Sequence, residues 1–375
     1  MSLLLISDSY HPDHRSSALI VRSIYDHFSN LNYKTHVLSL IESTPKIFSE
    51  NITFIKTKSF RNKNFVIRAI LTSYYILKMS VKLLFLKLNP SLVYIYYPSF
   101  FLLFLVPLIN FKYKKCKILI HYQDHFPENA YDLKIIKNKL IYNLIRKFRD
   151  KIIFNEKMHI VVNSHNQKKY LSNKQKIKNI FFFHNWAISK SIKINKKKKY
   201  SKFTFIYAGN IGPAQNLSVV LNVLSNNDFN INLKIYGSGR GYIDLKQKFK
   251  KFKNFEFNNF VDNSKLCNIY NKCHAALISL SANHNTNFIP SKFYDYCFQR
   301  IPIFSINHSN CELTSMINRN QIGIATSNYE STDLHSKLKL FINNYENYLN
   351  NGKFNIYDNN FKIFSNFLFR FLNNN

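Results

Sequence analysis

The sequence is poor in acidic residues. Its 375 residues include 20 Asp and Glu against 53 Lys and Arg, a formal net charge of +33. Lys, Asn, Ile, Phe and Tyr are all used heavily, as in a protein coded by an AT-rich genome, and that bias alone raises the Lys count. The resulting field still favours acidic partners: nucleic acid, anionic lipid or phosphorylated substrates.

Cysteine is scarce too, and no targeting signal is evident. The five cysteines form no CxxC pair, which excludes a disulfide framework and a cysteine metal site and indicates a cytoplasmic protein. No basic segment precedes the apolar residues 2–6, as a secretory signal requires. Zinc-finger spacing and RNP-like motifs are missing, so we expect no nucleic-acid partner, and the run Lys196–Lys199 is typical of a solvated linker.

Long apolar runs are limited to one. Leu92–Phe111 is uncharged and, at 20 residues, long enough to span a bilayer. Two internal prolines and a tyrosine cluster instead favour a buried strand at 92–96 followed by a short apolar helix at 100–108.

What the sequence does have is a repeated alternation of strands and helices. Apolar residues make up 46% of the chain, and its length suits two domains of roughly 150–200 residues. We therefore predict an α/β fold with two parallel sheets. The expected strands are SLLLIS (2–7), THVLSL (35–40), ITFIKT (52–57), LVYIYY (92–97), KILIHY (117–122), HIVVN (159–163), NIFFF (179–183), FTFIYAG (203–209), NLKIYG (232–237), FEFNNF (255–260), AALISL (275–280), IPIFSI (301–306) and IGIAT (322–326).

The strand pattern stops and restarts around a polar, basic stretch. We predict a first domain at 1–185, a basic linker at 186–202, a second domain at 203–350, and a C-terminal helix with an Asn-rich tail at 351–375. Helices are expected at about 16–31, 65–88 and 133–154, and an amphipathic one at 361–372. Ligands of such folds bind beyond the carboxyl ends of the strands, which predicts a cleft between the two domains.

The most informative segment is NFIPSKFYDYCFQRIPIF, residues 287–304. Pro290 at a helix entry leaves the N–H groups of Ser291, Lys292 and Phe293 pointing outward, and Lys292 adds a full positive charge. That end suits a phosphate, and Asp295, one turn deeper, can accept from sugar hydroxyls. The segment predicts a site for a diphosphate that carries a ribose, as in a nucleotide-sugar.

Two glycine turns follow strands in the second half. IYAGNIGPAQN (206–216) carries Gly209 and Gly212 before an expected helix start near Ala214–Gln215, a pattern equally typical of a structural turn and of a ligand loop. YGSGRGY (236–242) carries Gly237, with Arg240 as either a phosphate contact or an exposed side chain. It lacks the full GxGxxG dinucleotide motif.

Ionisable residues also follow two strands of the first half. HYQDHFPEN (121–129) places Asp124, His125 and Glu128 at a strand end, which favours a site, while His121 within the strand is equally typical of a core histidine. SDSYHPDHRSS (7–17) offers His11 and Arg15 at the same sheet edge. The spacing of His11, Asp13 and His14 is poor for a metal, and we expect none.

In this order the motifs resemble the GT-B glycosyltransferases of family 4, in particular the group 1 enzymes of bacterial surface polysaccharide biosynthesis. The resemblance covers most of the chain. It rests on the opening strand and loop, YQDHFPEN as the D-x-x-P-E segment, HNW (184–186) as the close of the first domain, YAGNIGPAQNL as the donor-side turn, and IPSKFYDYCFQRIPIF as the P-S-K-x-x-E-Y block.

That resemblance implies two Rossmann-like α/β/α domains facing across a cleft, and a retaining, metal-independent transfer of a hexosyl or N-acetylhexosaminyl group that needs no cofactor. It implies Asp124 and Lys292 as catalytic residues. The implied acceptor-side residues are His11, Arg15, Ser16, Ser17, His125 and Glu128. The implied donor-side residues are Gly209, Asn210, Gly212, Gln215, Gly237, Arg240, Phe260, Pro290, Ser291, Lys292 and Asp295.

The chain departs from the family pattern at several positions. Asn287 stands where many members carry a glutamate, and Asn210 and Gln215 replace the usual Arg and Lys of the donor turn. Ser16 and Ser17 replace paired glycines. Asp295 is a shorter replacement for the ribose-binding glutamate.

The predicted function is a glycosyltransferase acting on a nucleotide-diphosphate-sugar and a lipid-linked or saccharide acceptor, for O-antigen or capsule. The alternative is a non-catalytic GT-B-like assembly protein of the same pathway. Lys56–Leu88 interleaves basic and apolar residues, which is typical of a segment lying on an anionic bilayer and equally of a surface helix packed on the sheet. We expect a cytoplasmic protein, peripheral on the inner face of the plasma membrane.

Overall fold

The chain divides into two compact units in the computed structural model. Unit 1 comprises Met1–His184 with Asn360–Asn375, and unit 2 comprises Asn185–Asn359. The structure describes residues 1–13, 15–42, 49–58, 65–97, 99–155, 157–174, 179–188, 198–225, 229–282 and 289–373. His14, Asn287 and most of the predicted linker therefore lie outside the described residues.

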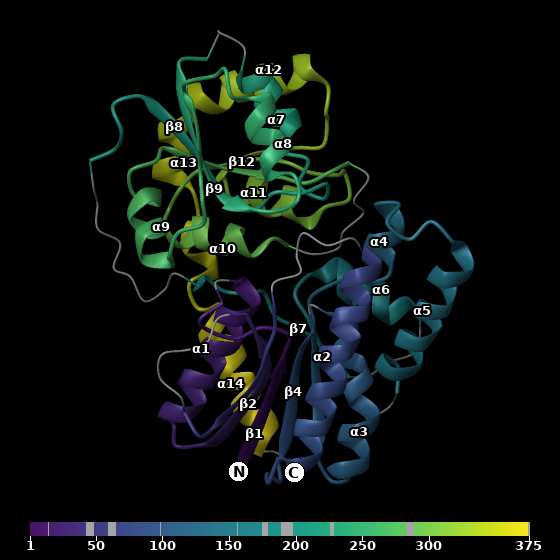
Figure 1. Cartoon of the computed structure of the whole chain (residues 1–375). Coiled ribbons are helices and arrows are strands. Elements are labelled where there is room, and N and C mark those ends of the chain that lie inside the picture. The colour runs from purple at the N-terminus through teal and green to yellow at the C-terminus, as the bar shows by residue number, and fades with distance from the viewer. Residues whose placement is uncertain are drawn as a thin grey trace. The chain divides into compact units, whose positions relative to one another are not determined.

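Unit 1 is built on a parallel sheet of seven strands in the order β3-β2-β1-β4-β5-β6-β7 (Figure 1). Chain order reverses between β1 and β4, so the crevice beyond their carboxyl ends is the expected ligand position of this unit. The strands are β1 (Ser2–Ser7), β2 (Lys34–Ile41), β3 (Ile52–Lys56), β4 (Leu92–Tyr97), β5 (Lys117–Tyr122), β6 (Met158–Val162) and β7 (Ile180–Phe182).

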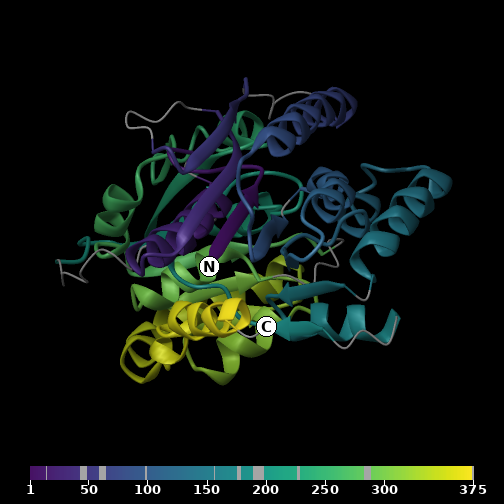
Figure 2. The ribbon, with the colours of Figure 1, turned by 90° about the horizontal axis from the view of Figure 1, so that it is seen from below.

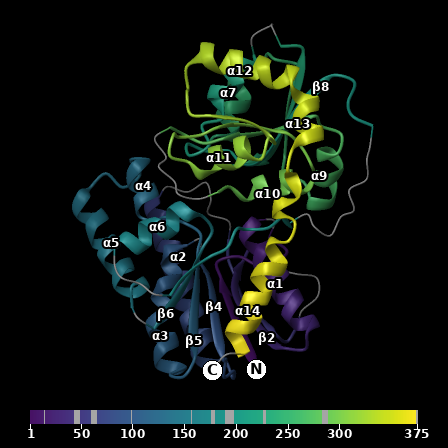
Figure 3. The same cartoon turned by 180° about the vertical axis from the view of Figure 1, so that it is seen from behind.

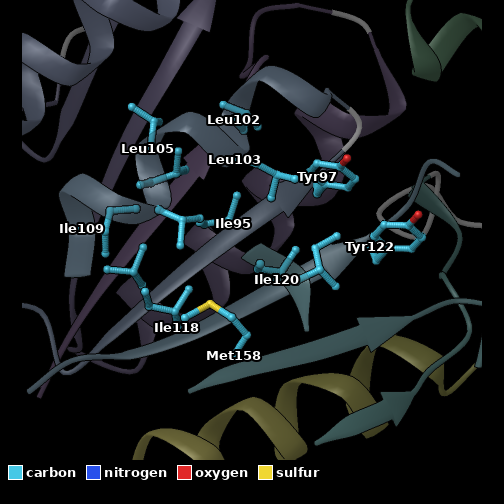
Figure 4. Packing of buried hydrophobic residues seen from close by; sticks show 14 of the residues in the cluster. Ile95, Tyr97, Leu102, Leu103, Leu105, Ile109, Ile118, Ile120, Tyr122 and Met158 are labelled. Atoms are coloured by element: carbon cyan, nitrogen blue, oxygen red, sulfur yellow. The ribbon is translucent and has the colours of Figure 1, made fainter. Parts of the chain in front are cut away.

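Helices cover both faces of this sheet, which is why its strands are continuous apolar runs. One face packs on α2 (Phe65–Phe85), η1 (Phe100–Phe104), α3 (Leu105–Lys112), α5 (Lys139–Ile153) and α6 (His165–Lys174). Figure 4 shows Ile95, Ile118 and Ile120 of the strands against Leu102, Leu105 and Ile109 of η1 and α3.

The opposite face carries α1 (Ser16–Asn30) and the C-terminal helix α14 (Asn360–Asn373). Figure 3 shows the yellow α14 beside α1, and Figure 2 shows it across the sheet from α2 and α3. The ring of Phe364 stacks on His121 of β5, and Phe361 meets His27 of α1. The last helix of the chain thus completes the core of the first unit.

Unit 2 repeats the plan with six parallel strands in the order β10-β9-β8-β11-β12-β13. Here chain order reverses between β8 and β11. The strands are β8 (Phe203–Asn210), β9 (Ile231–Ser238), β10 (Phe255–Asn258), β11 (Ala275–Ser279), β12 (Ile303–Ile306) and β13 (Gly323–Thr326).

Each face of the second sheet has its own apolar core. One core joins the sheet to α7 (Ser218–Leu224), α8 (Tyr242–Lys248) and α12 (Ser331–Asn343). The other joins it to α9 (Asn263–Tyr270), α10 (Ser291–Phe298), α11 (Glu312–Arg319) and η3 (Phe354–Tyr357). The remaining helices are α4 (Glu128–Asp132) in unit 1 and α13 (Tyr345–Asn351) in unit 2.

Every predicted strand forms, and the apolar run 92–111 divides into β4 and the helical η1–α3 segment as expected. No helix of the described residues is long and apolar enough to cross a membrane. The five cysteines are free thiols.

Two predicted helix starts were wrong. Ala214 and Gln215 lie in a hydrogen-bonded turn, and α7 begins only at Ser218. The helix expected from Leu133 begins at Lys139, where Asn138 caps it by accepting the amides of Leu140 and Ile141.

Candidate active site

The two glycine turns of unit 2 are packed directly against each other. Gly209 and Gly237 are paired in register on β8 and β9, and a Cβ added to Gly237 would lie 1.9 Å from the carbonyl oxygen of Gly209. A Cβ on Gly239 would lie 2.2 Å from the carbonyl oxygen of Ile211. Gly209 and Gly239 also have φ of +130° and +145°. Side chains at these positions are excluded, so the backbone itself forms the surface at the strand ends.

The donor-side turn is fixed by its own side chains. The Tyr207 hydroxyl donates to the carbonyl of Asn210 at 2.6 Å. The Asn210 amide Nδ2 donates to Gln215 Oε1 at 3.0 Å, and both atoms lie beside Gly212. Asn210 and Gln215, where the resemblance would lead one to expect Arg and Lys, therefore bind each other across the turn.

Helix α10 begins beside this turn. Pro290 is its N-cap, with φ −58° and ψ 133°, and no side chain among the residues that the structure describes caps the helix. The amides of Ser291 and Lys292 precede the intrahelical hydrogen-bond ladder and carry the positive end of the helix dipole. The amide of Phe293 was predicted to point outward. It instead donates to the carbonyl of the N-cap residue Pro290 at 3.0 Å, in the first turn of the helix.

Lys292 reaches from α10 onto the donor-side turn. A Cβ built on Gly209 would lie 3.1 Å from Lys292 Nζ, so the ammonium rests against the glycine. Nζ also lies 3.7 Å from the centroid of the Tyr207 ring. Burial lowers the pKa of Lys292 to about 7. The side chain makes no ion pair with a carboxylate in the described part of the chain.

The other predicted donor residues differ in their surroundings. Asp295 Oδ1 accepts the amide of Ile188 at 2.8 Å, so its carboxylate also anchors the segment that follows the buried Trp186. Arg240 is exposed beyond β9, and Phe260, two residues after β10, is 42% exposed. Neighbouring strand ends thus carry Gly209, Arg240 and Phe260 on one sheet edge.

In unit 1 the corresponding edge carries Asp124. It follows β5, and its Oδ1 accepts from Asn129 Nδ2 at 3.4 Å. Burial raises the pKa of Asp124 to about 6, and the negative charge of Asp8 adds to the effect. Asp8 follows β1, and β4 lies between β1 and β5 in the sheet. The ends of β1 and β5 thus carry two carboxylates whose charges interact, and sequence reasoning had identified only Asp124.

The first loop of unit 1 is organised by Arg15. Its Nη2 donates to the carbonyl of Asp8 at 3.2 Å and to Asp13 Oδ2 at 3.0 Å. Asp13 is buried and accepts the amide of Glu42 at 3.1 Å. Burial raises the pKa of Asp8, and the charge of Arg15 opposes that rise. Arg15 thus ties two carboxylates into the loop.

The remaining acceptor-side residues differ in exposure. Ser17 is buried, with its hydroxyl 2.6 Å from that of Ser9. Ser16 is exposed at the start of α1, and His11 is partly buried. Ser16 and His11 thus offer side-chain surface in this loop, whereas Ser17 does not.

Glu128 and His125 lie in a buried polar cluster. Glu128 forms a bidentate ion pair with Arg149, which has no exposed surface, and it accepts from the Tyr170 hydroxyl at 2.6 Å. Despite burial, these partners hold the pKa of Glu128 at about 2. His125 Nδ1 lies 3.2 Å from the Tyr122 hydroxyl, and the His125 ring packs edge-on against Tyr170. The cluster holds the loop that carries Asp124.

Three solved structures have this architecture. Sucrose-phosphate synthase from Thermosynechococcus elongatus matches with a TM-score of 0.69 and 9% identity, over 99% of this chain and 98% of that chain. Anabaena HepE in complex with UDP and glucose matches with 0.69 and 10%, over 99% of each chain. The lipopolysaccharide outer core galactosyltransferase WaaB matches with 0.63 and 14%, over 99% of each chain. The fold is GT-B.

The likeness to GT-B structures lies in the fold rather than in close sequence kinship. No protein-family model matches the sequence, and no curated protein matches it. The two Rossmann-like units agree with the predicted fold class.

Within this GT-B chain, sequence reasoning missed Asp8 and Tyr207. Asp8 directly follows the first strand, so its position at a strand end was the available signal. Tyr207 lies inside an apolar strand and gave none. The described residues hold no group of three or more His, Cys, Asp or Glu arranged for a metal ion. His14, from the loop weighed as a metal site, is outside that description.

Proposed function

We propose that this protein is a retaining glycosyltransferase. It moves a sugar from a nucleotide-diphosphate-sugar to a lipid-linked saccharide acceptor in bacterial surface polysaccharide biosynthesis. The observation that carries the proposal is Lys292, a cation without a carboxylate partner in the described chain, held at the start of α10 against the glycine turn. HepE structures with UDP and with UDP-glucose, and a starch synthase structure with ADP, support a nucleotide-sugar donor.

The donor side would act by electrostatics. As the bond between the anomeric carbon and the diphosphate breaks, negative charge grows on the departing phosphate oxygen. The amides of Ser291 and Lys292, the helix dipole and the Lys292 ammonium stabilise that charge. Asp295 would bind ribose hydroxyls. The arrangement supplies positive charge without a metal ion.

The acceptor side would act through Asp124. The acceptor hydroxyl oxygen forms the new bond to the anomeric carbon, and its proton passes to the departing diphosphate, which balances the reaction. Asp124 orients that hydroxyl by accepting its hydrogen bond. Burial, with the negative charge of Asp8 adding to it, raises the pKa of Asp124 to about 6.

A donor screen tests the enzyme assignment. Purified protein is incubated with UDP-, GDP- and ADP-sugars and an undecaprenyl-type acceptor, and products are measured by mass spectrometry beside Lys292→Ala. We expect one donor class to be transferred and the variant to lose at least about tenfold in rate. Full activity of Lys292→Ala would remove its assigned role. Calorimetric binding of a donor without transfer would favour the non-catalytic alternative, and no binding to any donor would refute the enzyme.

The membrane part of the proposal rests on α2. Its inner face is buried in the core through Tyr75, Ile76, Met79 and Leu83. A second apolar stripe faces outward at spacings of three and four residues, and Val66, Ile70 and Leu77 in it are each more than 60% exposed. The full stripe is Val66, Ile70, Tyr74, Leu77, Val81, Leu84 and Phe85. A helix that is apolar on its solvent side marks a docking surface.

The charges around this stripe select the kind of surface. Helix α2 contains Arg68, Lys78 and Lys82 and no acidic residue. Helix α5, on the same face of the sheet, exposes Leu140, Ile141 and Leu144 among further basic residues. An apolar stripe flanked by cations fits an anionic bilayer. The protein would therefore work as a peripheral protein on the cytoplasmic side of the plasma membrane.

Vesicle sedimentation tests this surface. We expect binding to phosphatidylglycerol vesicles at low salt and much weaker binding to phosphatidylcholine vesicles. The double variant Leu77→Ser/Val81→Ser should bind less, whereas Ile243→Ser, equally exposed on α8, should bind like the wild type. Absence of binding to anionic vesicles at low salt would refute the membrane proposal and leave the enzyme assignment untouched.

A further inference from the structure

Tyr207 contacts both halves of the donor-side site. Its side chain rises from the middle of β8 and is buried. Its hydroxyl donates to the carbonyl of Asn210 at 2.6 Å, and the face of its ring lies 3.7 Å from Lys292 Nζ. A single side chain therefore links the glycine turn to the lysine of α10.

Lys292 has two close neighbours in the described structure. Its Nζ lies over the face of the Tyr207 ring, and a Cβ built on Gly209 would be 3.2 Å from Cε and 3.1 Å from Nζ. Buried cations usually have a carboxylate partner, because isolated burial of charge is costly. Here the described chain supplies an aromatic face in that place.

We propose that Tyr207 is the positioning residue of Lys292: its ring face holds the ammonium at the mouth of the glycine turn without neutralising it, so that its full charge meets a diphosphate. The proposal rests on the donor site proposed above and deepens it. An aromatic ring attracts a cation through its quadrupole but has no net charge. A carboxylate in the same place would hold Lys292 equally well and repel the phosphate.

The charge state of Lys292 gives this arrangement a further consequence. Burial lowers its pKa to about 7, so the Lys292 amine is partly neutral at neutral pH. The ionisable groups nearby are Tyr207, Tyr296, whose hydroxyl accepts the amide of Ala208, and Asp295 one turn along α10. Burial raises the pKa of both tyrosines, so both stay neutral. A bound diphosphate would therefore draw a proton onto Lys292.

The test compares Tyr207→Leu with Tyr207→Phe, using inorganic pyrophosphate as the probe in calorimetry. Phe keeps the ring face and loses only the hydroxyl, whereas Leu removes the ring. Below the pKa of Lys292 the amine is charged both with and without the ligand. The ring then stabilises the cation equally in the free and the bound protein, so its loss changes the affinity for pyrophosphate little. Above that pKa the amine is charged only when pyrophosphate is bound, so loss of the ring weakens binding. The affinity of the wild type for pyrophosphate, divided by that of Tyr207→Leu, should be close to one near pH 5.5 and roughly ten near pH 8.5.

The ionisation of pyrophosphate itself cancels in these ratios. For Tyr207→Phe the ratio of wild-type to variant affinity should be small and should have the same value at both pH values. A Tyr207→Leu ratio that is the same at both pH values would assign Tyr207 a merely structural role and overturn the proposal. Failure of the wild type to bind pyrophosphate would instead refute the donor site, so the two failures are distinguishable.

A second measurement avoids dependence on variant stability. Substoichiometric acetylation of the wild type at neutral pH, followed by peptide mass spectrometry, should label Lys292 ahead of the surface lysines, because its amine is more often neutral. Pyrophosphate should protect it. Labelling of Lys292 no faster than the surface average, or without protection, would contradict the proposed position.

Discussion

Gly237 faces the carbonyl of Gly209 so closely that a Cβ on Gly237 would lie 1.9 Å from that oxygen. The two residues are paired in register at the carboxyl ends of β9 and β8. The contact fixes the turn against which Lys292 rests. The close approach of the β8 and β9 backbones at Gly209 and Gly237 therefore shapes the proposed donor site as directly as any side chain does.

Gly237→Ala should damage both stability and phosphate binding. The new methyl group must push β8 from β9, and such overpacking costs about 1–3 kcal/mol. Urea denaturation and pyrophosphate calorimetry measure the two effects. Gly241→Ala is the matched control, because its Cβ would meet nothing closer than 3.5 Å and its φ is −89°. Equal stability of the two variants would show that the strands separate freely.

Asp124→Asn should make the protein more stable and less active. Burial raises the pKa of Asp124 to about 6 from its usual value of 3.8. Because its pKa is raised by folding, Asp124 contributes to the free energy of unfolding fully at pH values below 3.8. That contribution is lost as the pH rises through 6. Above pH 6 the neutral Asn avoids the buried charge, so we expect a gain of about 1–3 kcal/mol at pH 7.5.

The measurement is urea denaturation at pH 7.5 and pH 4, with the exposed Asp244→Asn as the control. The gain should shrink at pH 4, where wild-type Asp124 is already protonated. A loss of stability at pH 7.5 would show that the carboxylate is needed by the fold rather than tolerated for the reaction.

Glu128→Gln, in contrast to Asp124→Asn, should make the protein less stable at neutral pH. Hydrogen bonds and charge from Arg149 hold the pKa of Glu128 at about 2. The Glu128 carboxylate therefore contributes to the free energy of unfolding above pH 4.5, and this contribution is lost as the pH falls through 2. Removing the carboxylate leaves Arg149 buried without this charge partner, which costs about 3–5 kcal/mol.

Thermal or urea unfolding at neutral pH measures that loss. The comparison is Asp333→Asn, which breaks the surface pair with Lys337 and should cost at most about 1 kcal/mol. If both variants lost the same small amount, the Glu128–Arg149 pair would contribute no more than a surface ion pair does.

Asp295→Asn separates ribose recognition from phosphate recognition. Asn keeps an oxygen that can accept the Ile188 amide, so the free energy of unfolding should change by less than about 1 kcal/mol. Affinity for UDP should fall roughly tenfold, because the hydroxyl would then bond to a neutral oxygen instead of a charged one, and such a bond is about half as strong. Affinity for pyrophosphate should not fall. A parallel loss for both ligands would place Asp295 at the diphosphate instead.

Much of the fold followed from the sequence because parallel strands buried on both faces are uniform apolar runs. Each predicted strand from SLLLIS to IGIAT forms. The helix predicted to start near Ala214–Gln215 begins only at Ser218, because the turn before it closes through the Gln215 and Asn216 amides, which donate to the Gly212 carbonyl. Local hydrogen bonds of this kind compete with a helix start without changing the apolar pattern.

The sequence alone determined the strand order in the chain, the helix that begins after Pro290, and the presence of Lys292, Asp124 and the glycines at strand ends. Only the tertiary structure decided what those residues meet. It placed α14 on the first sheet, the charge of Asp8 near enough to Asp124 to raise its pKa, and the Tyr207 ring under Lys292. Periodicity records whether a side chain is buried, but the partner of a buried charge comes from another element, and no local pattern specifies that element.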